Sequence, residues 1–323
     1  MDIPATYAAA CGATFLTGYP GCVSFAPGSI PVYFRFVPST AISASSAPSP
    51  LLRLRDETFD PTELGAYNLY LLASPSRLGL AVADVERRKF VVLEEYQLPA
   101  GGVPELAAQH DFLGQRGWNA VRLAVTGRAF TLLPAPLFRA GDEAAALRLH
   151  HTPTPAETVR HTTHPGLELV NVFAADAVLA DWLAATYGAT GRLMHHTSAL
   201  LAGIVHQRGA AAPRRLYLNP GPQELALVVL GQHLEYCNVF ACTTAEDVVY
   251  YTILVMQELS LDPEQDEITV WGELMPDSAV FSLLRTYVRN VRFGTRPGNV
   301  QYSYRLNDVF EYRYFDLFSL HFA

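Results

Sequence analysis

The basic side chains are almost all arginine, and this restricts the chemistry that the chain can do. Arginine occurs 22 times among 323 residues, whereas lysine occurs once, as Lys89. A P-loop, a protein kinase and a pyridoxal enzyme each need a positioned lysine. Because Lys89 lies in a charged turn after Arg87 and Arg88, it suits none of these classes. Arginine instead binds planar carboxylate and phosphate groups through two parallel hydrogen bonds.

A series of four arginines forms the clearest candidate site of this kind. The first two are four residues apart and are predicted to share one face of a helix. Two interpretations stay open: a docking patch for a carboxylate, a phosphate or an acidic protein, or intramolecular ion pairs with Asp277 and Asp308. The members of the series are Arg285, Arg289, Arg292 and Arg296.

Aromatic residues dominate the segment after position 309. Phe310, Tyr312 and Tyr314 alternate with charged residues, which predicts one face of a closing strand over residues 309–322. That face either packs under a helix or binds a partner, because aromatic and arginine side chains anchor protein interfaces. The candidate partner-binding residues are therefore the four arginines together with Tyr312, Tyr314 and Phe318.

The other reactive side chains do not form a catalytic or metal-binding motif. His150-His151 and His161-x-x-His164 lie in a Thr/Pro-rich connection without cysteine, which favours solvated histidines over a zinc site. The four cysteines include no C-x-x-C pair. Neither Gly-x-Ser-x-Gly nor His-Glu-x-x-His occurs. We therefore predict no catalytic residue and no bound metal.

An internal repeat predicts the elements that position these residues. Residues 69–82 and 216–229 align without a gap and are identical at seven of fourteen positions. After each copy the apolar pattern changes from period two to period 3.6 and back, so each half reads β-β-β-α-β-α. We predict a duplicated α/β fold. Helices are expected at 104–115, 136–149, 176–187, 198–206 and 277–288, with another that begins after Thr244.

Composition divides the chain into three parts. Residues 1–57 carry few charges and many prolines, which predicts a poorly ordered N-terminal extension. Residues 58–212 are expected to form the first half with its connecting helices, and residues 213–323 the second half. The sequence defines neither the partner nor the oligomeric state.

Charge and hydropathy exclude two further classes. A net charge of −8 and no basic run longer than three residues disfavour a nucleic-acid partner. The longest apolar runs fall far short of the roughly 20 residues that span a bilayer. The cysteines predict reduced thiols rather than a disulfide framework. We therefore expect a soluble, cytoplasmic protein.

Four short segments carry a family resemblance: FTLLP at 130–134, LVNVF at 169–173, EDVVYY at 246–251 and YFDLF at 314–318. From about Asp56 onward, they resemble a Bacteroidetes family, the domain of unknown function numbered 3822. The two-half pattern also resembles the actin, Hsp70 and sugar-kinase superfamily. The resemblance implies a duplicated ribonuclease-H-like (actin-like ATPase) fold with two halves around a cleft, and it supplies no activity.

The resemblance also implies where a nucleotide would lie. ATPases of the superfamily carry Asp-x-Gly at the first hairpin of each half and a Gly-Gly that holds adenosine. Here the first hairpin has neither Asp nor Gly, and the other two motifs read Asn219-Pro220-Gly221 and Gly272-Glu273. Proline also removes N–H donors from a loop that would face phosphate. A retained site for ATP and magnesium would use Asn219, Gly221, Gly272 and Glu273.

Two hypotheses from different classes follow. The first is a non-catalytic actin-like scaffold or adaptor that binds a protein partner and needs no cofactor. The alternative is a nucleotide-binding ATPase or small-molecule kinase of the same superfamily.

Overall fold

The computed structural model describes residues 49–209 and 212–323. The predicted N-terminal extension lies outside the described residues up to position 48. Directly after it, β1 (Pro50–Arg55) pairs antiparallel with residues 92–96. This strand corrects the predicted boundary at residue 57, because Leu52 and Leu54 pack against the core and arginines occupy the alternate positions.

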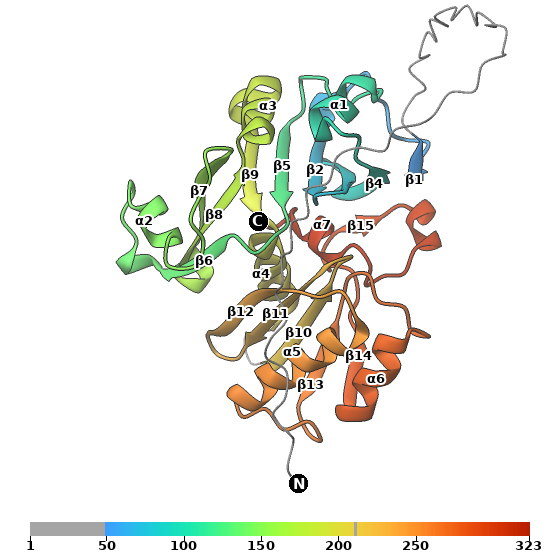
Figure 1. Cartoon of the computed structure of the whole chain (residues 1–323). Helices are drawn as coiled ribbons and strands as arrows, with labels where there is room; N and C mark the ends of the chain where they lie inside the picture. The colour runs from blue at the N-terminus through green and yellow to red at the C-terminus, as the bar shows by residue number, and fades with distance from the viewer. Residues whose placement is uncertain (1–48, 210–211) are drawn as a thin grey trace, which may run out of the picture. The chain divides into compact units, whose positions relative to one another are not determined.

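The first half is built on a sheet that begins with a three-strand antiparallel meander (Figure 1). A helix connects the meander to a strand that pairs parallel with the first strand of the meander. A second helix precedes one more strand, which pairs parallel with the strand before it. These elements are β2 (Tyr67–Ala73), β3 (Arg77–Asp84), β4 (Lys89–Gln97), α1 (Gly102–Gln109), β5 (Ala120–Val125), α3 (Ala177–Tyr187) and β9 (Gly191–His195). The sheet order is β1-β4-β3-β2-β5-β9.

The second half repeats this plan. Its elements are β10 (Arg215–Pro220), β11 (Glu224–Leu230), β12 (Leu234–Ala241), α5 (Ala245–Glu258), β13 (Glu267–Val270), α6 (Ala279–Tyr287) and β14 (Asn290–Phe293). The order β12-β11-β10-β13-β14 matches β4-β3-β2-β5-β9 of the first half. The register repeats as well: Leu69 lies opposite Val121, and 147 residues later Leu216 lies opposite Ile268. The predicted duplication is confirmed.

A small three-stranded sheet is inserted between β5 and α3, and the sequence analysis did not predict it. Its strands lie in the order β6-β8-β7, and a short helix packs against them. The predicted helix over 136–149 shrinks to five residues, because Gly141 has φ +100°, a backbone conformation that a right-handed helix does not contain. The inserted elements are β6 (Phe130–Pro134), α2 (Glu143–Leu147), β7 (Glu157–His164) and β8 (Leu169–Asp176).

The chain returns from the second half to the first after β14. There β15 (Gln301–Tyr302) pairs parallel with β4, and α7 (Phe315–Ser319) packs on α4 (His196–Gln207) and on β2 and β3. The predicted closing strand over 309–322 is therefore wrong. Apart from the exposed Phe310, its aromatic residues pack from several sides rather than on one face, which a short helix between two packed layers allows.

Alternation along β10 and β13 separates two apolar layers. Leu216, Leu218 and Ile268 face α5 and α6 within the core of the second half. Tyr217 and Trp271 point to the opposite, inner face and join the core that contains the first half. The inner face of the second sheet therefore belongs to the same core as the first half. On the other face, α5 begins with a capping box between Thr244 and Asp247.

Candidate functional site

The nucleotide-motif residues of the second half lie together at the seam between the halves. Asn219 and Gly221 stand at the end of β10, and Gly272 and Glu273 follow β13 directly. Because β10 and β13 are parallel neighbours, their C-terminal ends meet at one edge of the sheet. The Glu273 N–H donates to the Pro220 carbonyl at 2.8 Å, which joins the two motifs.

The backbone donors of these motifs are used within the chain. The Gly221 N–H donates to the Glu224 carbonyl at 2.8 Å, and the Gly272 N–H donates to the Tyr312 carbonyl at 2.9 Å. Gly272 has φ +85°, and a Cβ there would lie 2.4 Å from the Pro220 oxygen. Glycine is thus needed for close contact between the chain's own loops, where the superfamily motif would hold adenosine.

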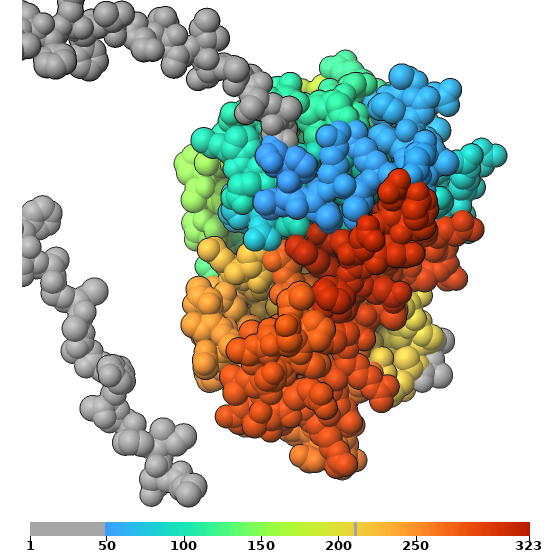
Figure 2. All heavy atoms as spheres, turned by 90° about the vertical axis from the view of Figure 1, so that its right-hand side faces the viewer, coloured from blue at the N-terminus to red at the C-terminus, as the bar shows by residue number. Residues whose placement is uncertain are grey.

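An ion-pair network crosses the seam. Arg77, which follows the first hairpin, donates to Glu95 of its own half at 3.1 Å and to Glu273 of the second half at 3.1 Å. Arg313 and the Tyr314 hydroxyl donate to the other oxygen of Glu95 at 3.2 and 2.9 Å. Figure 2 shows the C-terminal residues, in red, as a band of atoms between the blue first half and the orange second half. This part of the seam is therefore occupied by the chain itself.

A second polar contact in the seam is part-buried. The Asn219 amide donates to Asp316 of α7 at 3.1 Å. Burial raises the pKa of the Asp316 carboxyl, and the nearby His196 opposes that rise. Burial likewise lowers the pKa of the His196 imidazole against the pull of Asp316. Asn219 therefore anchors the C-terminal segment, in place of the aspartate that the superfamily motif would carry.

The four predicted arginines do not form one surface. The expectation that Arg285 and Arg289 share a helix face is wrong, because α6 ends at Tyr287. Arg289 pairs with Glu264 at 3.5 Å and Arg292 with Glu267 at 3.6 Å, whereas the sequence analysis named Asp277 and Asp308.

Arg296 lies apart from this series. Half-buried, it donates to the carbonyls of Leu306 and Val309 and lies over the Tyr302 ring. Arg285, Arg289 and Arg292 remain exposed.

The three predicted aromatic partner residues are buried instead of forming a docking face. Tyr312, Tyr314 and Phe318 expose 6%, 7% and 1% of their surface. Tyr312 stacks on Phe293 with ring centroids 4.2 Å apart, and Phe318 packs edge-on against Phe90 at 4.8 Å. Of the two interpretations left open for this segment, packing is the one that holds for these residues, and their assignment to a partner-binding face is wrong, since they hold the C-terminal segment against both halves.

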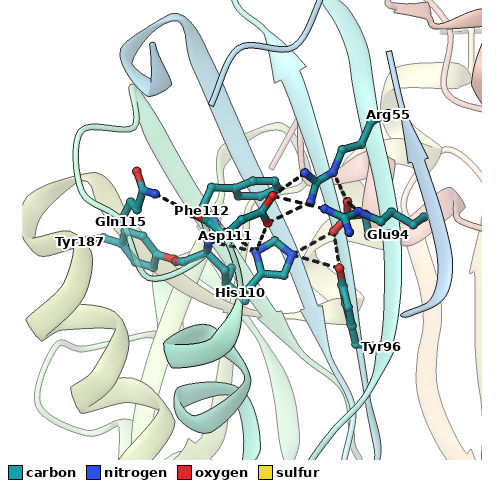
Figure 3. A network of polar contacts seen from close by, with 10 residues as sticks. Arg55, Glu94, Tyr96, His110, Asp111, Phe112, Gln115 and Tyr187 are labelled. Carbon is teal, nitrogen blue, oxygen red and sulfur yellow. Dashed lines mark hydrogen bonds and ion pairs between the residues drawn. The ribbon is translucent and has the colours of Figure 1, made fainter. Parts of the chain in front are cut away.

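A buried carboxylate in the first half was missed by the sequence analysis (Figure 3). Glu94 of β4 accepts from Arg55 Nε, from Tyr96 Oη at 2.7 Å and from His110 Nε2 at 2.9 Å. Burial opposes ionisation, but these donors outweigh it and lower the pKa of Glu94. The signal was the pair Glu94-Glu95 inside a β-rich apolar run. The network fastens β1 and the end of α1 to the sheet, because Arg55 also donates to Asp111 at 3.0 Å.

The described residues offer little for nucleophilic or metal chemistry. Burial raises the pKa of Cys237 to about 12 and that of Cys242 to about 11, so both thiols stay protonated at neutral pH. Within residues 49–209 and 212–323, no three His, Cys, Asp or Glu side chains are grouped to hold a metal ion. Of the helices in the same ranges, none has the length and apolar composition that crossing a bilayer requires.

Two solved structures have a similar fold. A Bacteroides thetaiotaomicron protein described as having an actin-like ATPase fold and unknown function matches with a TM-score of 0.66 and 19% identity, over 73% of this chain and 93% of its own. A PilM-PilN type IV pilus biogenesis complex matches with a TM-score of 0.52 and 16% identity, over 80% and 98%. The two halves thus form an actin-like ATPase fold.

The family follows from the sequence. The model of the protein family of unknown function DUF3822 matches residues 56–291, which is more than half of the chain. The chain belongs to this family, as the resemblance of its sequence segments indicated. None of the curated proteins matches it.

Proposed function

We propose that the chain is a non-catalytic actin-like scaffold that binds a protein partner. The observation that carries this proposal is that the backbone N–H groups of the loops expected to hold a nucleotide already donate hydrogen bonds within the chain. The N–H groups of Gly221, Gly272 and Glu273 all donate to backbone carbonyls, and Asn219 donates to Asp316. A triphosphate needs such donors, because they replace the water that solvates its charge.

Electrostatics at the seam supports the same proposal over an ATPase or kinase. The side chain at the second position of the Gly-Gly motif is Glu273, whose carboxylate is already paired with Arg77. A nucleotide held at this motif would have to break that pair and place its base against the charged side chain of Glu273. Separating an ion pair and desolvating its carboxylate costs free energy, which disfavours binding.

A protein partner is supported by a known use of the fold and by the charge of one surface. The PilM-PilN structure is a complex between two proteins, one of them with a similar fold. In this chain Arg285, Arg289 and Arg292 are exposed along α6, its following turn and β14. Arg289 and Arg292 form ion pairs of 3.5 and 3.6 Å through exposed side chains, so these pairs cost little to exchange for a partner's carboxylates. We assign these three arginines to the partner-binding surface.

Calorimetry of the full chain with ATP and magnesium tests the first part of the proposal. The expected result is no binding tighter than about 1 mM, which corresponds to only about 4 kcal/mol. A Kd in the micromolar range would overturn the proposal. Glu273→Gly, which restores the Gly-Gly motif, is the matched variant, and any gain in affinity should appear there first.

The partner is tested by quantitative cross-linking in the source cells with the wild-type chain and with Arg285→Glu/Arg289→Glu. We expect one protein to be cross-linked to the wild type and lost from the variant. Arg160→Glu, an exposed arginine on β7, is the control that should keep it. A cross-linking pattern that is the same in all three chains would contradict the assignment of the arginines.

A further inference from the structure

A cavity lies on the inner face of the second sheet. It has a volume of about 370 Å³ and is enclosed by α4 on one side and by β10, β13 and β14 on the other. Arg215 and Asn219 are four residues apart on β10, so the charged end of this cavity is about 13 Å from the nucleotide-motif loops. Of the residues that line it, the proposed scaffold function uses only Arg292, at the mouth of the cavity.

Strand alternation explains why this face is open and polar at one end. The opposite face of β10 and β13 is covered by α5 and α6 through Leu216 and Ile268. On the inner face, Arg215 and Glu267 stand at the start of the two strands, beside the last turn of α4. The chain after β14 returns to the first half and does not lay a helix over this end among the described residues.

The cavity is positively charged in a chain whose net charge is −8. Three arginines line it, and one carboxylate lies between two of them: Glu267 contacts Arg215 at 3.1 Å and Arg292 at 3.6 Å. The third arginine, Arg208, donates to the backbone carbonyls of Gly231, Ala212 and Pro213. Two positive charges are therefore left without a counter-charge inside the cavity, which concentrates anions there.

Donors remain available for such an anion. The side chain of Arg215 is 30% exposed, and among the described residues Glu267 is the only carboxylate that pairs with its guanidinium. The side chain of Arg292 is 71% exposed and is held only by its long contact with Glu267, so it can turn toward a ligand at little cost. Ile204 and Phe293 form apolar walls around these groups.

We propose that this cavity binds a small organic anion. A carboxylate or phosphoryl group would accept hydrogen bonds from Arg215 and Arg292, and a compact apolar body would pack against Ile204 and Phe293. The volume lies at the lower end of the range for small-molecule sites, about 300–1,000 Å³. Glu267 competes with the ligand for both arginines and so sets its affinity.

Calorimetry with two probes, benzoate and phenyl phosphate, tests the site on the full chain. We expect one or both to bind in the submillimolar range, and the preferred probe to identify the anionic group. Arg292→Gln, at an exposed side chain, should weaken binding about tenfold, the value of one charge-assisted hydrogen bond. Glu267→Gln should strengthen binding, because it removes the competing carboxylate.

The control is Arg160→Gln, which removes an exposed arginine from β7 and should bind both probes as the wild type does. No binding of either probe at about 5 mM would overturn the proposal. Equal loss of affinity in Arg160→Gln and Arg292→Gln would also overturn it, since binding would then reflect net charge. These results are independent of the ATP titration, which reports on loops at the other end of the strands.

Discussion

Replacing Gly272 by alanine tests whether the loop after β13 is docked on the end of β10 as described. The substitution places a Cβ 2.4 Å from the Pro220 oxygen and 2.6 Å from Asn219 Oδ1, distances that Cβ atoms essentially never show. The loop must therefore move away from Pro220. It would stretch the hydrogen bond from the Glu273 N–H, which is now 2.8 Å long.

The expected cost is the sum of three effects. An alanine at φ +85° costs about 1 kcal/mol. Relief of an overpacked contact costs about 2 kcal/mol, and the weakened hydrogen bond costs about 1 kcal/mol. We therefore expect the free energy of unfolding to fall by about 4 kcal/mol in Gly272→Ala.

A matched control separates the backbone effect from the contact. Gly117 has φ +101°, and no atom lies within 4 Å of a Cβ built there. Gly117→Ala should therefore lose only about 1 kcal/mol. Urea unfolding followed by circular dichroism gives both values by linear extrapolation. If the two variants lose the same free energy, the close approach of Gly272 to Pro220 does not exist and the argument for occupied nucleotide loops fails with it.

Two further predictions concern buried titratable groups. Folding lowers the pKa of Glu94 below its ordinary value of 4.5. The ionised carboxylate therefore stabilises the folded chain above pH 4.5, and this contribution is lost as the pH falls through the pKa of Glu94 in the folded state. The difference in unfolding free energy between wild type and Glu94→Gln should therefore shrink below pH 4.5 in acid titrations of urea unfolding; a constant difference would contradict the network around Glu94. Cys237 and Cys242, with pKa values raised to about 12 and 11, should react with iodoacetamide far more slowly in the folded chain than in urea at the same pH. Mass spectrometry of the two cysteine peptides measures both rates, and equal rates in the two states would refute the burial of the thiols.

The duplicated core could be predicted because the pattern of each half is local. The spacing of Leu69 and Leu71 recurs at Leu216 and Leu218, and the apolar period changes at the same points in both halves. Patterns of this kind depend on residues that are close together in the chain, so they can be read directly from the sequence. The resemblance to the actin-like superfamily, rather than periodicity, pointed to Asn219, Gly221, Gly272 and Glu273, and the structure places them at the end of β10 and just after β13.

The other elements depend on contacts between distant residues. β1 is stabilised by Arg55 reaching Glu94 and Asp111, and Asn219 finds its partner at Asp316. No local pattern records such pairs. The alternation of Tyr312 and Tyr314 even favoured the wrong element, since a segment packed between two layers buries alternate residues without being a strand.

The return of the chain to its first half has a consequence for biosynthesis. Phe90 of β4 is fully buried, and it is covered by Tyr302 and Phe318. The ribosome makes those two residues more than 200 residues after β4. Until then the first sheet carries a bare aromatic surface, of the kind that chaperones recognise and that aggregates form on. The half that is translated first is therefore completed last, and a nascent chain that stops before residue 301 cannot finish it.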